Sequence, residues 1–243
     1  MFEEVTTAVR SVQRRALVVV ILLLIGIALD SIGVVATFSQ IGLLKAIARG
    51  VMLQPGVAAS NDARMALVAV LKGLSYFLTA AAFLIWMVKA RHNLPLLGAR
   101  SLEYSPWWTV ASFIVPILAL IRPYQVMVEI WTASDPNRDG EQSWTWRNPP
   151  ATLRWWWGSF LVMSICGTIL TLMASDKSGA VIPRLISHSY FGIVKNLIDI
   201  AAALVTILMI QSVNGQQSAG MVRLLAAPLQ TATPDTEAPM LDN

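Results

Sequence analysis

The chain has 243 residues, of which 56% are hydrophobic and 13% are Asp, Glu, Lys or Arg. Soluble domains contain about 45–50% apolar and about 25% charged residues. This composition, with a mean hydropathy of +0.61, therefore excludes a soluble enzyme, a disordered chain and a disulfide scaffold. The net charge of +4 is small and scattered along the chain, so we expect no nucleic-acid partner.

Four apolar blocks are long enough to cross ~30 Å of hydrocarbon as helices. The first block exceeds the apolar core of a cleavable signal, which is about 7–15 residues long, so we expect it to be retained as a span. The blocks predict an all-α integral membrane protein with a single domain over residues 1–215. The predicted spans cover about residues 16–38, 64–87, 153–174 and 190–210.

Two other segments are predicted to lie outside the hydrocarbon. Residues 41–53 are too short to cross it, and Lys45 and Arg49 fall on one helical face, which predicts an interfacial helix. Residues 216–243 turn to Gln, Thr, Pro and Asp, which predicts a flexible C-terminal tail.

The third element, residues 106–131, is irregular. Its apolar part spans only ~24 Å as a straight helix, it contains Pro116, and the pair Arg122–Pro123 interrupts it. Pro123 fits the first turn of a new helix, where a missing N–H costs nothing. The segment predicts either a fifth span or a proline-broken element that re-enters or lies along the membrane surface.

The distribution of basic residues chooses between these alternatives. With five spans, the sixteen Lys and Arg residues outside the spans divide equally between the two sides. With four spans, eleven lie on the side of the N-terminus and five on the other. Because cytoplasmic loops are enriched in Lys and Arg, we predict four spans, a cytoplasmic N-terminus and location in the cell membrane.

Polar residues gather around the third element. Arg122 and Glu129 are about two helical turns apart and share a face, and Arg91 and Asn93 are predicted on the same side of the membrane. One interpretation is a site at the cytoplasmic membrane face that binds a head group, an anion or a partner loop. The other is that these side chains satisfy one another and the broken backbone, as irregular backbone at membrane depth requires.

Four charged residues lie inside the predicted spans: Asp30, Lys72, Lys195 and Asp199. The predicted topology puts Asp30 and Lys72 at similar depth on adjacent helices, and Lys195 and Asp199 have the spacing of a same-face pair. We therefore predict one neutral polar layer. This layer would either fix the register and packing of the helices or carry protons or cations. The alternative is that no layer forms and each charged side chain extends to the lipid boundary.

The sequence offers no catalytic motif and no metal-ligand cluster, so we expect neither enzymatic activity nor a cofactor. Tryptophans favour the membrane–water boundary because the ring is apolar and its N–H needs a polar partner. The predicted interfacial aromatics are Trp107, Trp108, Trp131, Trp155, Trp156 and Trp157.

The segment from Phe83 to Trp131 carries an ordered set of distinctive residues. It comprises Trp86, Arg91, Asn93, Gly98, Pro106, Trp107, Trp108, Phe113, Pro116, Arg122, Pro123, Tyr124, Glu129 and Trp131. With these residues the chain resembles a bacterial family of multi-pass membrane proteins known as domain of unknown function 4328. The resemblance implies a bacterial inner-membrane protein and carries over no activity, ligand or catalytic residue.

Three functional hypotheses follow. The first is a non-catalytic accessory or regulatory subunit that acts through contacts with other membrane protein subunits. The second is a small-solute or ion permease or channel that works as a homo-oligomer, because charges lie within the spans and broken helices often line substrate sites. The third is a membrane protein that binds a lipid head group.

Overall fold

A computed structural model describes residues 2–99, 102–115, 118–135 and 149–230. Within these ranges all regular structure is helical. The elements are α1 (Phe2–Ala48), α2 (Val57–His92), α3 (Pro106–Ile114), the 3₁₀ turn η1 (Leu118–Leu120), α4 (Arg122–Ala133), α5 (Ala151–Ser175) and α6 (Val181–Gln230).

Four of these helices, α1, α2, α5 and α6, are long and apolar enough to cross a membrane. This confirms the prediction of an all-helical chain with four membrane-span-like helices. The helices continue well beyond the apolar blocks. At ~1.5 Å per residue, α1 is ~70 Å long, about twice the hydrocarbon thickness.

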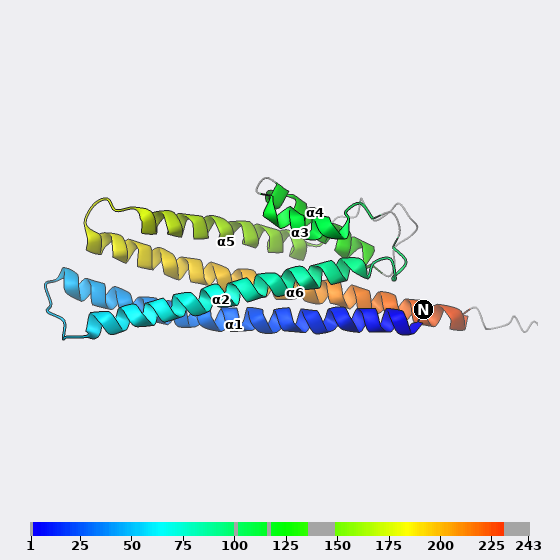
Figure 1. The fold of residues 1–243 in the computed structure, drawn as a ribbon, viewed down its shortest axis with the longest axis horizontal. Coiled ribbons are helices and arrows are strands. Elements are labelled where there is room, and N and C mark those ends of the chain that lie inside the picture. Colours follow the sequence, from blue (N-terminus) through cyan, green and yellow to red (C-terminus); the bar gives the residue numbers. More distant parts are fainter. Residues whose placement is uncertain (1, 100–101, 116–117, 136–148, 231–243) are drawn as a thin grey trace, which may run out of the picture.

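The four long helices run alternately up and down, with α1 beside both α2 and α6, and α5 beside α6 (Figure 1). The first residues of α1 and α5 and the last residues of α2 and α6 all lie toward the same end of the bundle. We call it the N-terminal end. The connection from α2 to α5 therefore starts and finishes at this end.

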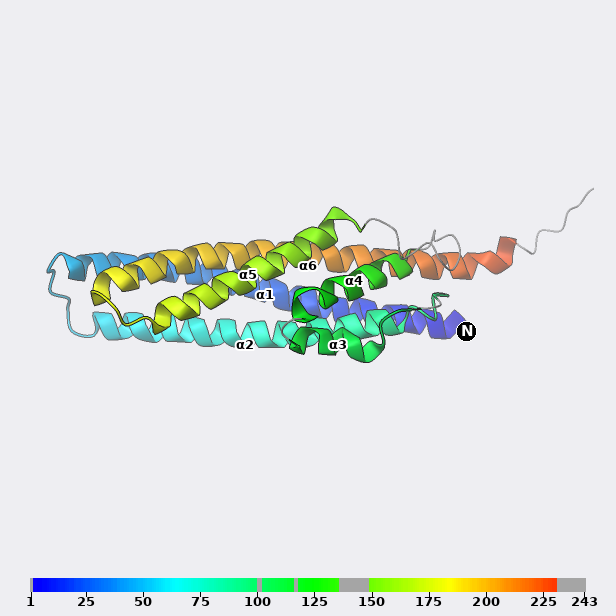
Figure 2. The ribbon, with the colours of Figure 1, turned by 90° about the horizontal axis from the view of Figure 1, so that it is seen from above.

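The short helices α3 and α4 pack against α2 and α5 near the N-terminal end (Figure 2). Helix α3 ends at Ile114, and α4 begins at Arg122 with Pro123 in its first turn. Pro116, predicted to break this region, lies outside the described residues. Neither short helix is among those that can span a membrane by length and composition.

Two predicted boundaries differ from the observed ones. Residues 41–48, expected to begin an interfacial helix over 41–53, continue α1 without a break, because the first strong helix-ending signal is Gly50, with φ of 78°. Residues 216–230, expected to begin the flexible tail, continue α6 to Gln230. The remainder of that predicted tail lies outside the described residues.

The hydrophobic core lies in the N-terminal half of the bundle. All four long helices and α4 supply fully buried members, which include Val19, Trp86, Met127, Leu153 and Met209. The two short helices therefore complete the core, because α4 supplies side chains that fill the space between the long helices there.

Candidate functional site

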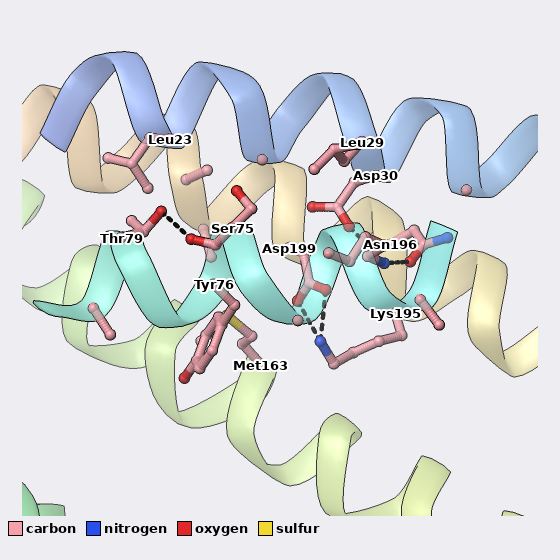
Figure 3. Close-up of a pocket in the computed structure, with 18 of the residues that line it drawn as sticks. Leu23, Leu29, Asp30, Ser75, Tyr76, Thr79, Met163, Lys195, Asn196 and Asp199 are labelled. Atoms are coloured by element: carbon pink, nitrogen blue, oxygen red, sulfur yellow. Dashed lines mark hydrogen bonds and ion pairs between the residues drawn. The ribbon is translucent and has the colours of Figure 1, made fainter. Parts of the chain in front are cut away.

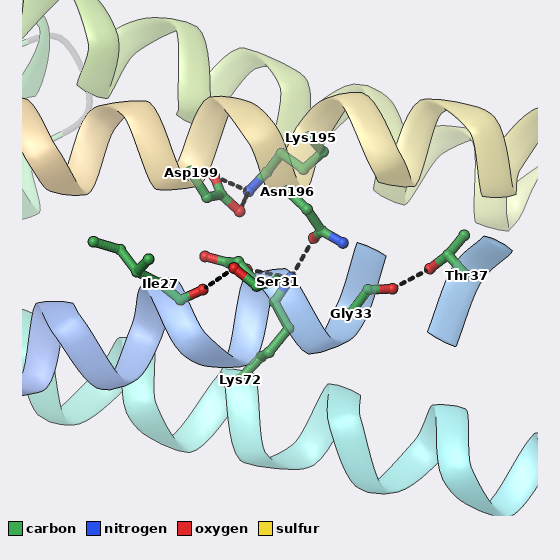
Figure 4. Close-up of polar contacts among 9 residues, drawn as sticks. Ile27, Ser31, Gly33, Thr37, Lys72, Lys195, Asn196 and Asp199 are labelled. Atoms are coloured by element: carbon green, nitrogen blue, oxygen red, sulfur yellow. Dashed lines mark hydrogen bonds and ion pairs between the residues drawn. The ribbon is translucent and has the colours of Figure 1, made fainter. Parts of the chain in front are cut away.

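A layer of charged side chains crosses the middle of the bundle. Lys72 of α2 forms an ion pair with Asp30 of α1, with 2.6 Å between Nζ and Oδ1. The same ammonium group donates a hydrogen bond to the side-chain oxygen of Asn196 in α6 (Figure 4). One lysine thus joins three of the long helices.

A second ion pair belongs to the same layer. Lys195 Nζ lies 2.6 Å from both carboxylate oxygens of Asp199, one turn further along α6. Asp199 is also close enough to Asp30 and Lys72 for electrostatic interaction. Asp30, Lys72, Lys195 and Asp199 together form what we call the charge layer, which has two acids, two bases and no net formal charge.

Two glycines lie beside this arrangement, and Gly33 makes room for it. A side-chain carbon added at Gly33 of α1 would lie only 3.0 Å from the Asn196 amide nitrogen. One added at Gly167 of α5 would lie 3.5 Å from Lys195 Cε. Small residues allow helices to approach closely in membranes, and here they admit polar side chains between the helices.

A cavity of about 830 Å³ lies along the charge layer (Figure 3). This volume is within the range of small-molecule sites, about 300–1,000 Å³. Residues from all four long helices line it, and most of them are apolar. The polar residues that line it include Asp30, Gln40, Lys72, Ser75, Tyr76, Thr79, His188, Lys195, Asn196 and Asp199.

Aromatic rings line the cavity at its N-terminal end. Phe83 of α2 lies 5.9 Å from Trp156 of α5, and Phe113 of α3 lies 6.4 Å from Phe160 of α5 (distances between ring centroids). All four residues line the cavity. We call them the aromatic floor, because they bridge α2, α3 and α5 across that end.

The cavity is only partly enclosed, between α2 and α5. In the described part of the chain, these two helices do not pack closely against each other. Near the N-terminal end, α3 and α4 occupy the space between them. At the level of the charge layer, the residues that line the cavity come from the long helices.

A separate buried ion pair lies at the N-terminal end. Arg91 Nε of α2 is 3.2 Å from Glu129 Oε2 of α4, and both side chains are almost fully buried. The other Glu129 oxygen accepts hydrogen bonds from the backbone N–H groups of Glu103 and Tyr104. Burial raises the pKa of Glu129 above its usual range, opposed by the Arg91 charge and these two hydrogen bonds.

Additional hydrogen bonds hold α4 in place. Gln217 of α6 donates from Nε2 to the carbonyl oxygen of Ala90 and to the hydroxyl of Ser134. The indole N–H of Trp131 donates to Ser212 of α6. The sequence analysis did not identify Gln217, although a glutamine near the end of an apolar helix is the kind of polar residue that joins helices in membranes.

The structure brings together only part of the predicted polar cluster around the third element. Arg91 and Glu129 are paired, but the Arg122 guanidinium lies over the Tyr104 ring, 5.3 Å from its centroid. Asn93 is buried, and its side-chain nitrogen has no hydrogen-bond partner among the described residues. Whether the cluster binds a ligand remains a prediction.

The predicted interfacial tryptophans divide into two groups. Trp107, Trp108 and Trp155 are exposed, whereas Trp156 and Trp157 are buried in the core; a position at the membrane–water boundary stays a prediction for all of them. Three consecutive tryptophans in the sequence do not show which of them are buried. Consecutive residues on a helix point in different directions, so their exposure can differ. Trp131 is half-buried and hydrogen-bonded to α6.

Groups that could bind a metal ion or act as a nucleophile are few among the described residues. No group of three or more His, Cys, Asp or Glu side chains there is arranged to hold a metal ion. The free thiol of Cys166 is partly buried. The charged, hydroxyl and apolar groups that line the site can offer a ligand ion pairs, hydrogen bonds and apolar contact.

In the described residues these features define an all-helical fold with four helices that are long and apolar enough to cross a membrane, and with a polar layer and a cavity between them. The chain belongs to the family described as domain of unknown function (DUF4328), whose family model matches residues 49–215. No curated protein and no solved structure matches the chain. The matched range contains every residue of the charge layer except Asp30.

Proposed function

We propose that this protein is a non-catalytic membrane protein that binds a lipid-like amphiphile in its cavity. Its role is that of an accessory or regulatory subunit within a larger membrane assembly. The observation that carries the proposal is a cavity of about 830 Å³ that combines an apolar wall with a charge layer. An amphiphile offers apolar chains to the wall and a polar head to the charges.

The wall composition supports an amphiphile over a water-soluble ligand. Water-soluble ligands need polar groups along much of their surface, whereas most residues that line the cavity are apolar and its ion pairs lie at one level. The cavity lies between helices that are long and apolar enough to cross a membrane. A molecule that already resides in the membrane can enter without crossing an aqueous boundary.

A permease is the second candidate, favoured by charges inside the spans. The aromatic floor argues against it, because a transport path must continue to the other side of the membrane. Here Phe83, Phe113, Trp156 and Phe160 cross the cavity at its N-terminal end. A cavity that ends in the bundle suits binding better than passage.

For membrane orientation we infer four spans in the cell membrane, the inner membrane of a bacterium, with the N-terminal end cytoplasmic. Helices α3 and α4 then form a re-entrant or interfacial element. The count of eleven basic residues against five supports this orientation. So does the return of the α2–α5 connection to the end where it began.

Cysteine labelling tests the orientation in cells. In a Cys166→Ser background, His92→Cys and Arg147→Cys should be labelled from the cytoplasmic side, and Ser60→Cys from the other. Arg147 lies outside the described residues, so labelling supplies information on the segment that the structure leaves open. Labelling of positions 92 and 147 from opposite sides would contradict the four-span orientation.

Native mass spectrometry of the protein in mild detergent tests the binding function. Wild type should retain about one lipid-sized ligand, and Gly192→Trp should lose it. Gly192 lines the cavity, and a side-chain carbon added there meets no atom within 4 Å. Gly42→Trp is the matched control, because Gly42 has equal free space on α1 but does not line the cavity.

The same sample tests the accessory role. Foreign subunits in fixed proportion would support it, whereas a symmetric oligomer of the chain alone that conducts ions in liposomes would favour the permease. If Gly192→Trp and Gly42→Trp retained lipid equally, binding in the cavity would be contradicted.

A further inference from the structure

We propose that the charge layer selects a zwitterionic membrane lipid, whose head group carries one positive and one negative charge. This inference rests on the proposed function, because it names the ligand class of the same cavity. It is carried by three features of the site: the neutrality of the layer, the access of both signs of charge to the cavity, and the apolar length beyond the layer.

The neutrality of the layer disfavours a ligand with net charge. Asp30 is paired with Lys72, and Lys195 with Asp199. Each charged group of the layer already has a partner of opposite charge. An ion that entered the cavity would therefore find no free counter-charge, and an uncompensated charge is costly at membrane depth. A zwitterion brings both charges with it and leaves the layer neutral.

Both signs of charge are accessible from the cavity. The side chains of Lys72 and Lys195 are 27% and 18% exposed, and those of Asp30 and Asp199 are 11% and 14% exposed. A phosphate can approach the ammonium groups while the cationic group of the same head approaches a carboxylate. A wholly apolar ligand would instead leave four charged groups facing hydrocarbon.

A hydroxyl group adds to the polar recognition at this level. Ser75 lines the cavity one helical turn from Lys72. It is 8% exposed, and its Oγ has no hydrogen-bond partner among the described residues. Ser75 therefore adds a neutral polar group beside the charged residues that line the cavity.

The source of the zwitterion is a lipid rather than a free solute. From Asp30 to Val19, the N-terminal limit of the cavity on α1, eleven residues span ~16 Å. The rings of the aromatic floor bound this stretch, whose α1 wall is apolar. A free zwitterion would leave it empty, whereas the chain of a lipid held by its head at the charge layer would fill it.

A competition experiment tests the head-group selectivity. The wild-type protein, in an uncharged detergent, is incubated with equal amounts of phosphatidylethanolamine, phosphatidylglycerol and diacylglycerol, and bound lipid is counted by native mass spectrometry. We expect phosphatidylethanolamine to exceed each of the others by at least about tenfold. Preference for phosphatidylglycerol or diacylglycerol, or equal retention of all three lipids, would overturn the inference.

Charge variants provide an internal control. Asp199→Asn leaves a net positive layer and should shift retention toward phosphatidylglycerol, whereas Lys195→Met should reduce phosphatidylglycerol retention further. The double variant Lys195→Met with Asp199→Asn restores neutrality and should restore the preference for phosphatidylethanolamine. Unchanged selectivity in folded single variants would overturn the inference. The wild-type competition remains decisive if a single variant fails to fold.

Two further outcomes separate this inference from the proposed function. Displacement of lipid by glycerophosphoethanolamine, which has the same zwitterionic phosphodiester head but no acyl chains, at equal concentration would mean that the ligand is a solute, and would overturn the choice of a lipid. Retention of no lipid at all, of any head group, would contradict the proposed function and this inference together. Lipid retention that Gly192→Trp abolishes but that shows no head-group preference would overturn this inference alone.

Discussion

The two halves of the bundle use ion pairs in different ways. At the N-terminal end, Arg91 and Glu129 are almost fully buried in a closely packed core. In the other half, the pairs of the charge layer are partly exposed along a cavity. An ion pair enclosed on all sides can only hold structure together, whereas one that faces a cavity is available to a ligand. We therefore assign stability mainly to the first half and binding to the second.

The largest expected effect is on the buried pair at the N-terminal end. Glu129→Ala leaves Arg91 charged and unpaired, and loss of one partner of a buried pair costs about 3–5 kcal/mol. We expect this loss in unfolding measurements in mild detergent. The double variant Arg91→Met with Glu129→Leu should recover most of it, and equal stability of the single and double variants would contradict an ion-pair role.

The next largest effect is expected for substitution of a tryptophan at the start of α5, where a buried and an exposed tryptophan can be compared. Trp156 is 3% exposed and Trp155 is 70% exposed. Trp156→Ala should cost about 3–5 kcal/mol, as expected for a large side chain removed from a core, and Trp155→Ala should change stability by about 0.5 kcal/mol or less. Similar thermal unfolding of the two variants would contradict the packing of α5 against the core.

A smaller effect is expected in the charge layer, whose side chains are less buried. Asp30→Asn removes the partner of Lys72 and should cost about 2 kcal/mol, below the full penalty for an intramembrane charge because Lys72 keeps Asn196 as a partner. Asp30→Asn combined with Lys72→Met should cost less than Asp30→Asn alone. Greater destabilisation in the double variant, measured by denaturant unfolding in detergent, would contradict the pairing.

The smallest effect is expected at Arg122. Its guanidinium lies over the Tyr104 ring and does not share the buried environment of Arg91. Arg122→Ala should therefore cost about 0.5–1 kcal/mol, the range for a cation–π contact near the surface. A loss as large as that of Glu129→Ala would place Arg122 within the core network instead.

The spans were predictable from the sequence because hydropathy and length determine them. The charge count predicted in addition that the chain between the second and third spans returns to the side where it began. The contact between Asp30 and Lys72 could be anticipated, because residues at equal depth on adjacent antiparallel helices meet if they face each other. The i,i+4 spacing of Lys195 and Asp199 is a local rule that needs no tertiary information.

Other features depended on packing that no local pattern records. The burial of Trp156 beside an exposed Trp155 depends on where α3 and α4 fold back, which hydropathy does not specify. The hydrogen bonds of Asn196 and Gln217 between helices could not be predicted, because they depend on which face of each helix meets its neighbour. The cavity follows from the absence of close packing between α2 and α5, a property of the whole bundle.

Photo-crosslinking with a zwitterionic lipid tests the central claim most directly. The lipid carries a photoreactive group at the end of one chain, and modified residues are mapped by peptide mass spectrometry. We predict modification of cavity residues near the aromatic floor, Phe113 and Met163 among them, and its loss in Gly192→Trp. Modification confined to outward-facing residues such as Val70 and Phe77, unchanged in Gly192→Trp, would contradict a lipid site within the bundle.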